Sequence, residues 1–369
     1  MLPRKTIVAG PVYLSLTTES NSLTAATLPD QGLDAESVTH TVSGRAAVTA
    51  IALHHFGVPV HLVGKVGDDR FGRAVVNHCK EVSPELVPGI VLDPSTRTGV
   101  TIHDALQEGV GATQNSPGAN NTFYASDIPR ADLQQGDLFH FTDPAAMRSV
   151  YRDEGGELLS ILQRARREGL TTSLDLYLPE LSDSPSAVDW ALVLENCLRY
   201  IDVLIIDGMD LVRVFKPDFS DQPIGEVLSP DLLGELSGKV ISSGVEIILV
   251  RLGSQGVYLR TAPSAAWKKA GRALEGFGEV WQDQTLWLPA FKGDDAEPAE
   301  GAERLVTGFL GSLLRGEAPE KAILTASAAQ ALPETGSWEE LQAQLSESWT
   351  ELPLQVAGED WRKEGPHEA

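Results

Sequence analysis

Cysteine is nearly absent from this 369-residue sequence, which contains only Cys79 and Cys197. The two lie far apart and have neither metal-ligand nor redox spacing, so a disulfide framework is excluded and a reducing compartment is expected. Apolar runs are short, and none approaches the roughly 18 residues that a membrane-spanning helix needs. The apolar patch within residues 1–10 leads directly into a strand pattern, unlike a secretion signal. We therefore expect a cytoplasmic protein.

Positive charge is in deficit, with 29 Lys and Arg against 52 Asp and Glu and a formal net charge of −23. This field would repel nucleic acid and anionic membranes, so we expect neither as a partner. A small molecule or another protein is expected instead. The eight histidines include no pair at metal-site spacing, and the sequence has neither a Gly-x-Ser-x-Gly elbow nor a Walker-type phosphate loop. Hydrolase and P-loop NTPase functions therefore have no support.

Short apolar runs alternate with longer segments of helical period, which is the pattern of a parallel sheet covered by helices. A chain of this length and 42% hydrophobic content can bury a large core. The sequence therefore predicts a three-layer α/β/α core. The expected strands are Thr6–Ala9, Val60–Val63, Leu138–Phe141, Thr172–Leu176, Val203–Ile206 and Ile247–Leu252, and the expected helices include Ala46–Phe56, Phe71–Val82, Gly156–Glu168 and Ala187–Tyr200.

Two stretches interrupt this alternation, at residues 14–42 and 95–125, where Thr, Ser, Asn and Gly are dense. We expect both to be excursions from the core. Residues 337–369 form an acidic C-terminal extension in which a weak helical period breaks down at Gly365-Pro366. A surface helix with a frayed end is the plain interpretation of this extension.

A long motif begins with SGRAA at residues 43–47 and continues, after a helix, with FGVPVHLVGKVGDDRFG at residues 56–72. A glycine loop opens the helix, Gly57 suits its C-terminal cap, and the GDDRFG turn starts the next helix. This motif resembles the first signature of the ribokinase (PfkB-type sugar kinase) family. The resemblance covers about residues 4–336 and implies a ribokinase-like three-layer α/β/α sandwich, with a mostly parallel central sheet and a small β lid.

The resemblance also predicts the domain organisation. Residues 1–336 would form one ribokinase-like domain, and the excursions at 14–42 and 95–125 would be inserted lid segments. Such a lid covers the sugar and often forms a dimer interface in this family, so a homodimer through the lid is expected.

The family's second signature, Asp-Thr-Thr-Gly-Ala-Gly-Asp, aligns without a gap with EPAEGAE at residues 297–303. In the family its last Asp is the catalytic base, and the resemblance assigns that role to Glu303. One extra methylene displaces this carboxylate by about an ångström, which can cost on the order of 10²-fold in rate. The amides of Gly301 and Ala302 would form a reduced anion hole, while Glu300 places a carboxylate where a phosphate is expected. Glu300 could instead stabilise the helix start through the helix dipole, which is the favoured interpretation.

The sugar side of the expected site is altered. The family's Asn-x-Asp after the first strand corresponds to residues 13–15 (YLS), so its carboxylate is lost, and its Gly-Gly-x-x-x-Asn corresponds to residues 43–48 (SGRAAV). Arg45 at the helix start could attract an anionic substrate, or could be an ordinary surface arginine. The resemblance implies these substrate-binding residues: Ser15, Ser43, Gly44, Arg45, Asn120 and Asp175.

On the nucleotide side, the family's Asn-x-x-Glu becomes residues 207–210 (DGMD), where Asp207 and Asp210 could hold Mg²⁺ through water. Those acidic groups could equally cap a helix. The turn between Gly253 and Gly256 could admit ATP. Arg251 replaces a Thr and could contact a phosphate, and Ser327 replaces an Asn near the adenine.

Two functions from different classes remain open. The first is an ATP- and Mg²⁺-dependent carbohydrate kinase that phosphorylates a hydroxyl of a sugar or nucleoside-like substrate. The second is a catalytically inactive descendant that keeps the fold as a binding or interaction module. Loss of both the sugar carboxylate and the anion-hole glycines favours a protein without catalytic activity, which is the second function. The resemblance itself indicates a kinase.

Overall fold

The computed structural model describes most of the chain. The described residues are 4–20, 37–106, 112–178, 188–219, 228–289, 291–292, 298–330, 336–348, 355–356 and 367–368. Part of the first expected lid segment (21–36), the acidic loop around Asp294 and most of the C-terminal tail beyond residue 348 lie outside them.

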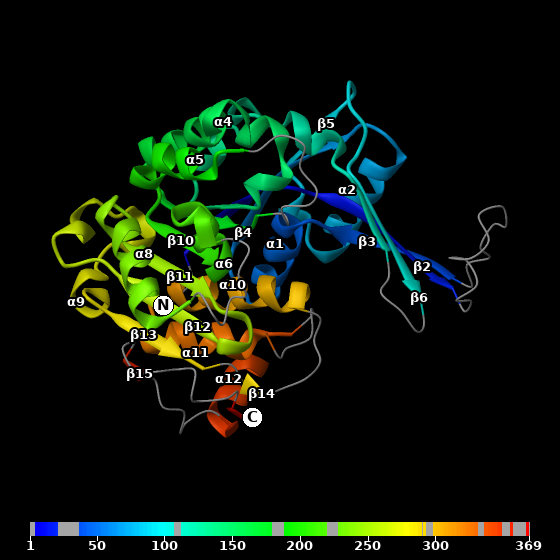
Figure 1. Cartoon of the computed structure of the whole chain (residues 1–369). Coiled ribbons are helices and arrows are strands. Elements are labelled where there is room, and N and C mark those ends of the chain that lie inside the picture. The colour runs from blue at the N-terminus through cyan, green and yellow to red at the C-terminus, as the bar shows by residue number, and fades with distance from the viewer. Residues whose placement is uncertain are drawn as a thin grey trace.

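A large mixed sheet runs through the centre of the molecule (Figure 1). Within the described residues it has ten strands in the order β15-β13-β12-β11-β10-β9-β8-β1-β4-β5, of which those from β11 to β5 are parallel and those from β12 to β15 antiparallel. The strands are β1 Thr6–Ala9, β4 Val60–Gly67, β5 Gly89–Asp93, β8 Leu138–Thr142, β9 Thr171–Leu176, β10 Val203–Asp207, β11 Ile247–Arg251, β12 Val257–Thr261, β13 Thr285–Leu288 and β15 Gln355–Val356.

Helices cover both faces of this sheet, as the alternating pattern predicts (Figure 1). The helices are α1 Arg45–His55, α2 Arg70–Val82, α3 Arg130–Leu133, α4 Arg148–Arg167, α5 Trp190–Cys197, α6 Gly208–Phe215, α8 Pro230–Ser242, α9 Gly278–Trp281, α10 Pro298–Leu314, α11 Pro319–Ala329 and α12 Trp338–Ser348. Helix α4 consists of two helical segments, separated at Arg152–Gly155 by non-helical backbone. None of the helices in the described ranges is both long and apolar enough to cross a bilayer.

Two hydrophobic clusters form the core, one on each side of the sheet. Side chains alternate along a buried strand, so in β10 Val203 and Ile205 join one cluster while Leu204 and Ile206 join the other. The first cluster packs under α1, α10 and α11, and the second under α4, α5 and α8. The three-layer fold expected from the sequence is therefore confirmed.

A second sheet projects from the body as a lid (Figure 1). Its order is β3-β2-β6-β7, built from β2 Tyr13–Ser20, β3 Ser37–Ser43, β6 Val100–Leu106 and β7 Ala112–Ser116. Strands β2 and β6 pair in parallel, and the two outer pairings are antiparallel. The two excursions in the sequence thus build one small lid sheet, as expected.

The C-terminal extension begins with a docked helix. Leu341 and Leu345 of α12 are buried in the first core cluster. Trp338 packs edge-on against Phe56, with ring centroids 5.6 Å apart, and the Arg315 guanidinium lies 3.8 Å from the Trp338 ring centroid. The weak helical period therefore does correspond to a helix, held to the domain by its apolar face.

Candidate active site

The candidate site lies where parallel strands end, which is where open α/β sheets place ligands. Asp143 directly follows β8, Tyr177 directly follows β9, and Asp207 is the last residue of β10. Helices α1 and α10 add Arg45 and Glu303. The sequence placed most of these residues in the site without showing which would touch.

Arg45 is the residue at which these elements meet. Its Nη1 atom is 2.8 Å from Glu303 Oε1, and its Nε atom is 3.8 Å from Asp143 Oδ2. The guanidinium carbon lies 4.2 Å from the ring centroid of Tyr177, within the range of a cation–π contact. The Arg45 side chain is only 12% exposed, so it is not an ordinary surface arginine.

Gly44 fixes the direction from which Arg45 enters the site. Its φ of +91° belongs to a region that side chains disfavour. A Cβ atom at Gly44 would also lie 2.4 Å from the Pro11 carbonyl oxygen. Helix α1 can therefore begin at Arg45 only because glycine precedes it.

Glu303 points a carboxylate into the same buried region. Its side chain is 13% exposed, and its Oε2 atom is buried without a hydrogen-bond partner among the described residues. Burial raises the pKa of Glu303 above its ordinary value, whereas the charge of Arg45 lowers it. The ion pair thus places a cation beside one carboxylate oxygen, while Arg45 Nη1 and Glu303 Oε2 are both buried without a hydrogen-bond partner among the described residues.

Gly301 and Ala302 lie inside α10, which begins at Pro298. In an α-helix each amide donates to the carbonyl four residues earlier, so the Ala302 amide is directed at Pro298. The amides that the first turn leaves unpaired are those of Ala299 and Glu300, since proline has no N–H. An anion hole at Gly301 and Ala302 stays a prediction, and the Glu300 side chain lies outside the described residues.

Asp143 is a site residue that the sequence analysis missed. Its backbone is left-handed, with φ 50° and ψ 56°, a conformation that is uncommon for residues with side chains and tolerated best by Asn and Asp. Its amide donates to the Asp175 carbonyl oxygen at 3.0 Å. Burial, together with the negative charges of Asp175 and Glu303, raises the pKa of Asp143 to about 6. The local signal was an Asp before Pro144 at a strand end, which alone indicates only a turn.

Asp175 and Arg251, predicted for substrate and nucleotide respectively, contact each other beneath the site. Arg251 Nη1 donates to Asp175 Oδ1 at 2.6 Å, and Nη2 donates to the Leu176 carbonyl oxygen at 3.2 Å. Both side chains are buried. Burial acts to raise the pKa of Asp175, but the nearby charges of Arg251, Arg45 and His140 together lower it. A buried pair of this kind supports the floor of the site in the state described. Direct ligand contacts by either residue stay predictions.

Asn120 joins the base of the lid to the core. Its Oδ1 accepts a bond from the Val12 amide at 2.9 Å, and its Nδ2 donates to the carbonyl oxygens of Val12 at 2.9 Å and Pro117 at 3.0 Å. The side chain is completely buried. These three hydrogen bonds account for the burial of Asn120 by a structural role. A role in substrate binding stays a prediction.

Ser15 and Ser43 lie on neighbouring strands at the lid base, and Ser15 is 3% exposed. The Ser43 hydroxyl is buried and finds no partner within the described ranges. An unmet hydroxyl beside Arg45 suits a polar ligand, because buried polar groups in folded proteins are otherwise satisfied.

The nucleotide-side residues lie on the neighbouring strand ends. Asp207 caps α6 by accepting the Met209 amide at 2.9 Å. Asp210 accepts the Leu178 amide at 2.9 Å and an Arg213 bond at 3.0 Å. Burial first, and the Asp207 charge further, raise the pKa of Asp210 to about 6. The helix-cap interpretation of Asp207 is therefore confirmed, while water-mediated Mg²⁺ binding stays a prediction.

The Gly253–Gly256 turn connects β11 and β12. Both glycines have positive φ, and a Cβ at Gly253 would meet no atom within 4 Å. That open space fits the approach of a nucleotide. Ser327 is buried in α11, which packs along α10. No cluster of three or more His, Cys, Asp or Glu side chains that could hold a metal occurs in the described part of the chain.

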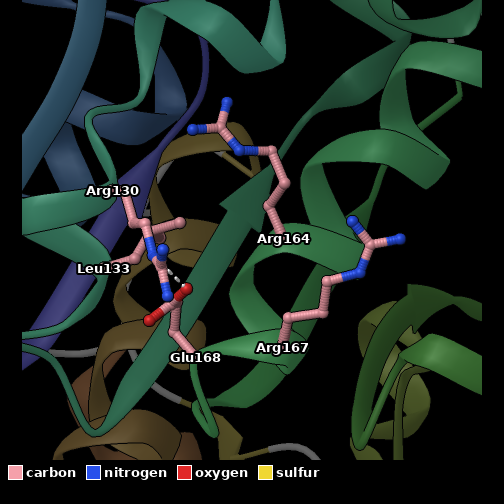
Figure 2. Close-up of a pocket in the computed structure, with 5 residues that line it drawn as sticks. All are labelled: Arg130, Leu133, Arg164, Arg167 and Glu168. Atoms are coloured by element: carbon pink, nitrogen blue, oxygen red, sulfur yellow. Dashed lines mark hydrogen bonds and ion pairs between the residues drawn. The ribbon is translucent and has the colours of Figure 1, made fainter.

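A separate hollow of about 340 Å³ lies between α3 and α4 (Figure 2). Arg130 pairs there with Glu168 at 2.6 Å. Arg164 instead donates to the Ala125 and Ile128 carbonyl oxygens. Basic residues at the end of α4 also complement the helix dipole. Helix α4 leads into the start of β9, whereas Asp143 follows the end of β8, so this hollow lies at the opposite ends of the strands from Asp143. Its contacts are structural.

Comparisons with known structures agree with this fold. A structure of Arabidopsis thaliana ribokinase, complexed with ribose and ATP, has a TM-score of 0.70 at 16% identity and covers 94% of this chain and 100% of its own. A ribokinase II-type protein from Escherichia coli, solved with ATP and Mg²⁺, has a TM-score of 0.69 at 14% identity, covering 93% and 99%. These likenesses show the ribokinase-like fold.

Sequence comparisons indicate the family. A 2-dehydro-3-deoxygluconokinase from Thermoproteus tenax is 23% identical over 303 residues, covering 79% of this chain and 78% of the relative. The family model described as pfkB family carbohydrate kinase matches residues 11–272. That range includes the lid base, Arg45, Asp143 and the Gly253 turn, and it ends before α10. The chain belongs to the pfkB family of carbohydrate kinases.

Proposed function

We propose that this protein transfers the γ-phosphoryl group of ATP to a hydroxyl group of a sugar or nucleoside-like substrate. The observation that carries the proposal is Glu303 Oε2, a buried carboxylate oxygen with no partner among the described residues, at the carboxyl edge of the sheet. The substrate oxygen forms a bond to the γ-phosphorus, the bond between that phosphorus and the β–γ bridging oxygen breaks, and ADP leaves. Glu303 takes the hydroxyl proton.

Substrate hydroxyls would bind on the lid side of Arg45. Ser43 offers an unmet hydroxyl, and Asp143 offers a carboxylate that can replace the one missing at Ser15. Ribose in the plant ribokinase and the sugar acid named for the Thermoproteus tenax relative support a carbohydrate-like substrate. Gly44 would contribute by letting the backbone approach closely.

The nucleotide would lie along the Gly253–Gly256 turn, with Ser327 toward the base. Bound MgATP supplies the phosphoryl group and the cation that neutralises the phosphates. Asp207 and Asp210 would hold Mg²⁺ through water, and Arg251 would lie below the phosphates while bound to Asp175. Structures of related fold that were solved with ATP, one of them also with Mg²⁺, support MgATP as the donor.

We also propose that residues 1–336 act as one domain and that two copies associate through their lids. Val38 is 63% exposed on β3 and Ile102 is 38% exposed on β6, the two strands that flank β2 in the lid sheet. Exposed apolar side chains of this kind favour an interface. Sedimentation of the intact protein and of Val38→Lys tests this arrangement, since a lid dimer should become a monomer in the variant.

A binding test precedes any assay of turnover. Thermal unfolding with MgATP at 100 times its dissociation constant should show stabilisation of about 2.7 kcal/mol. Addition of sugars and sugar acids to the MgATP complex then identifies the substrate by a further rise in Tm. A protein whose Tm is the same at millimolar MgATP as in its absence does not have the proposed donor site.

One observation favours a second function, that of an inactive binding module. Because α10 begins at Pro298, the amides of Ala302 and Glu303 are directed into the helix rather than toward a phosphate. A phosphate at this helix end would therefore have to be received by the unpaired amides of Ala299 and Glu300 instead. A protein that binds sugar and MgATP yet releases no ADP would be such a module.

A further inference from the structure

The extra length of Glu303 creates a positioning problem for the proposed catalytic base. A glutamate has one more rotatable bond than the aspartate of the family signature, so its carboxylate has more orientations to lose. An unrestrained base of this kind would rarely point at the substrate hydroxyl. Misplacement by about 1 Å can reduce the rate on the order of 10²-fold.

The structure supplies a restraint in Arg45. Its Nη1 atom lies 2.8 Å from Oε1 of Glu303. Both side chains are largely buried, with 12% of Arg45 and 13% of Glu303 exposed. Arg45 is itself held on its other side by Asp143 and by the ring of Tyr177. A guanidinium held by these two contacts restricts the carboxylate beside it through the attraction of opposite charges.

The charges around Glu303 are mixed, and each comes from a different element. Arg45 at the start of α1 and Arg251 at the end of β11 favour the ionised carboxylate, whereas Asp175 in β9 disfavours it. Asp143 after β8 adds a further negative charge nearby. Arg45 is the cation in direct contact with Glu303, so it dominates the favourable side of this balance.

We propose that Arg45 is the positioning residue of the catalytic base: it holds Glu303 by Oε1, so that the unpartnered Oε2 accepts the proton of the substrate hydroxyl. This inference rests on the proposed kinase function and extends it. Arg45 and Glu303 act as one unit, in which the arginine compensates for the longer acidic side chain. Arg45 itself takes no proton and contacts no reacting atom.

The test compares Arg45→Met and Arg45→Lys with wild type by measuring kcat, KM and the pH dependence of kcat/KM. Arg45→Met should lower kcat by about 10²-fold with a smaller change in KM. The acidic limb of the pH profile of kcat/KM should move to higher pH in this variant, because loss of the cation raises the pKa of Glu303. Arg45→Lys should recover part of kcat and return the limb toward its original pH. Arg130→Gln, which breaks the ion pair outside the site, is the control and should match wild type.

Opposite results overturn the inference. If Arg45→Met is as active as wild type, Arg45 does not position the base, and if the variant is faster, Arg45 obstructs it. An acidic limb that stays in place in Arg45→Met contradicts the charge contact.

A titration of ¹³C-labelled glutamate by NMR separates this inference from the proposed function. The Glu303 resonance is identified by its absence in Glu303→Gln. Arg45→Met should move its titration midpoint to higher pH even if the wild-type protein transfers no phosphoryl group. Absence of turnover with a shifted midpoint removes the kinase proposal alone, whereas an unshifted midpoint removes the role of Arg45.

Discussion

Asp143 is the single residue whose setting is hardest to explain by structure alone. It has left-handed backbone, contacts Arg45, and lies close enough to Asp175 and Glu303 for their charges to act on it. Unfavourable backbone conformations and crowded like charges occur mostly where function requires them. We therefore propose that Asp143 binds substrate and supplies the carboxylate that Ser15 lacks.

Asp143→Asn should make stability less dependent on pH. The folded-state pKa of about 6 lies above the ordinary value, so the unfolded chain loses this proton first and stability falls between about pH 4 and 6. Asparagine tolerates the left-handed backbone. It also removes the free-energy cost of ionising a buried carboxyl group in the folded protein, which is about 2–3 kcal/mol at most. Urea unfolding at pH 4.5 and 7 measures the difference. An unchanged pH profile in the variant would contradict the assignment.

The sequence predicted the residue types of the site better than their pairings. Arg45, Glu303, Asp175 and Arg251 were all singled out, because their positions in the motifs determine which helices and strands carry them. That Arg45 binds Glu303 and Arg251 binds Asp175 depends on how four separate elements pack. Spacing along one chain does not contain that information.

At the scale of elements, the connection from β3 into α1 determines the site. Gly44 turns the chain so that α1 begins at Arg45, and the Schellman-like bonds at Gly57, from its amide to the His54 carbonyl at 2.8 Å and from Val58 to Leu53 at 3.0 Å, end the same helix. Both ends were readable in the sequence as glycines at helix boundaries. The close approach of Gly44 to Pro11 was not, since Pro11 lies on another segment.

Gly44→Ala should therefore be much more damaging than Gly57→Ala. Both glycines have positive φ, but a Cβ at residue 44 meets the Pro11 carbonyl oxygen at 2.4 Å, whereas one at residue 57 meets nothing within 4 Å. Gly57→Ala should cost about 1 kcal/mol from backbone conformation alone. Gly44→Ala should cost several times as much and displace Arg45. Equal Tm losses in the two variants would show that the close approach does not matter.

For the molecule as a whole, the alternating apolar pattern was sufficient to predict the layers, because burial on two faces imposes the periods of helix and strand. The antiparallel strands β12 and β13 and the docking of α12 were not predicted. Their apolar residues resemble those of any buried segment, and only the packed core shows which surface they cover.

Asp202 and Glu246 form a buried acidic pair at the starts of β10 and β11, the ends of the strands opposite the site. This pair should make the free energy of unfolding depend on pH. Glu246 is 2% exposed, and its Oε2 atom has no partner in the described part of the protein. Burial first, and the neighbouring Asp202 further, raise the pKa of Glu246 to about 9. The unfolded chain ionises this group near pH 4.5, so stability should fall as pH rises from there to about 9.

Glu246→Gln should remove most of that fall and stabilise the protein at pH 8. Glu235→Gln, at a surface glutamate that contacts Lys216 and Lys239, is the matched control and should change little. Guanidinium unfolding between pH 5 and 9 provides the comparison. If wild type and Glu246→Gln have parallel profiles, Glu246 is ionised in the folded protein.

The most direct test of the central claim, that Glu303 is the base of a working kinase, is ADP release by wild type and Glu303→Gln with MgATP and the substrate found by thermal shift. We predict turnover by wild type and a loss of about 10²–10⁴-fold in Glu303→Gln, the usual worth of a general base, with the MgATP-induced rise in Tm retained. Equal rates in the two proteins, or no ADP from wild type with any ligand that binds, would contradict the claim.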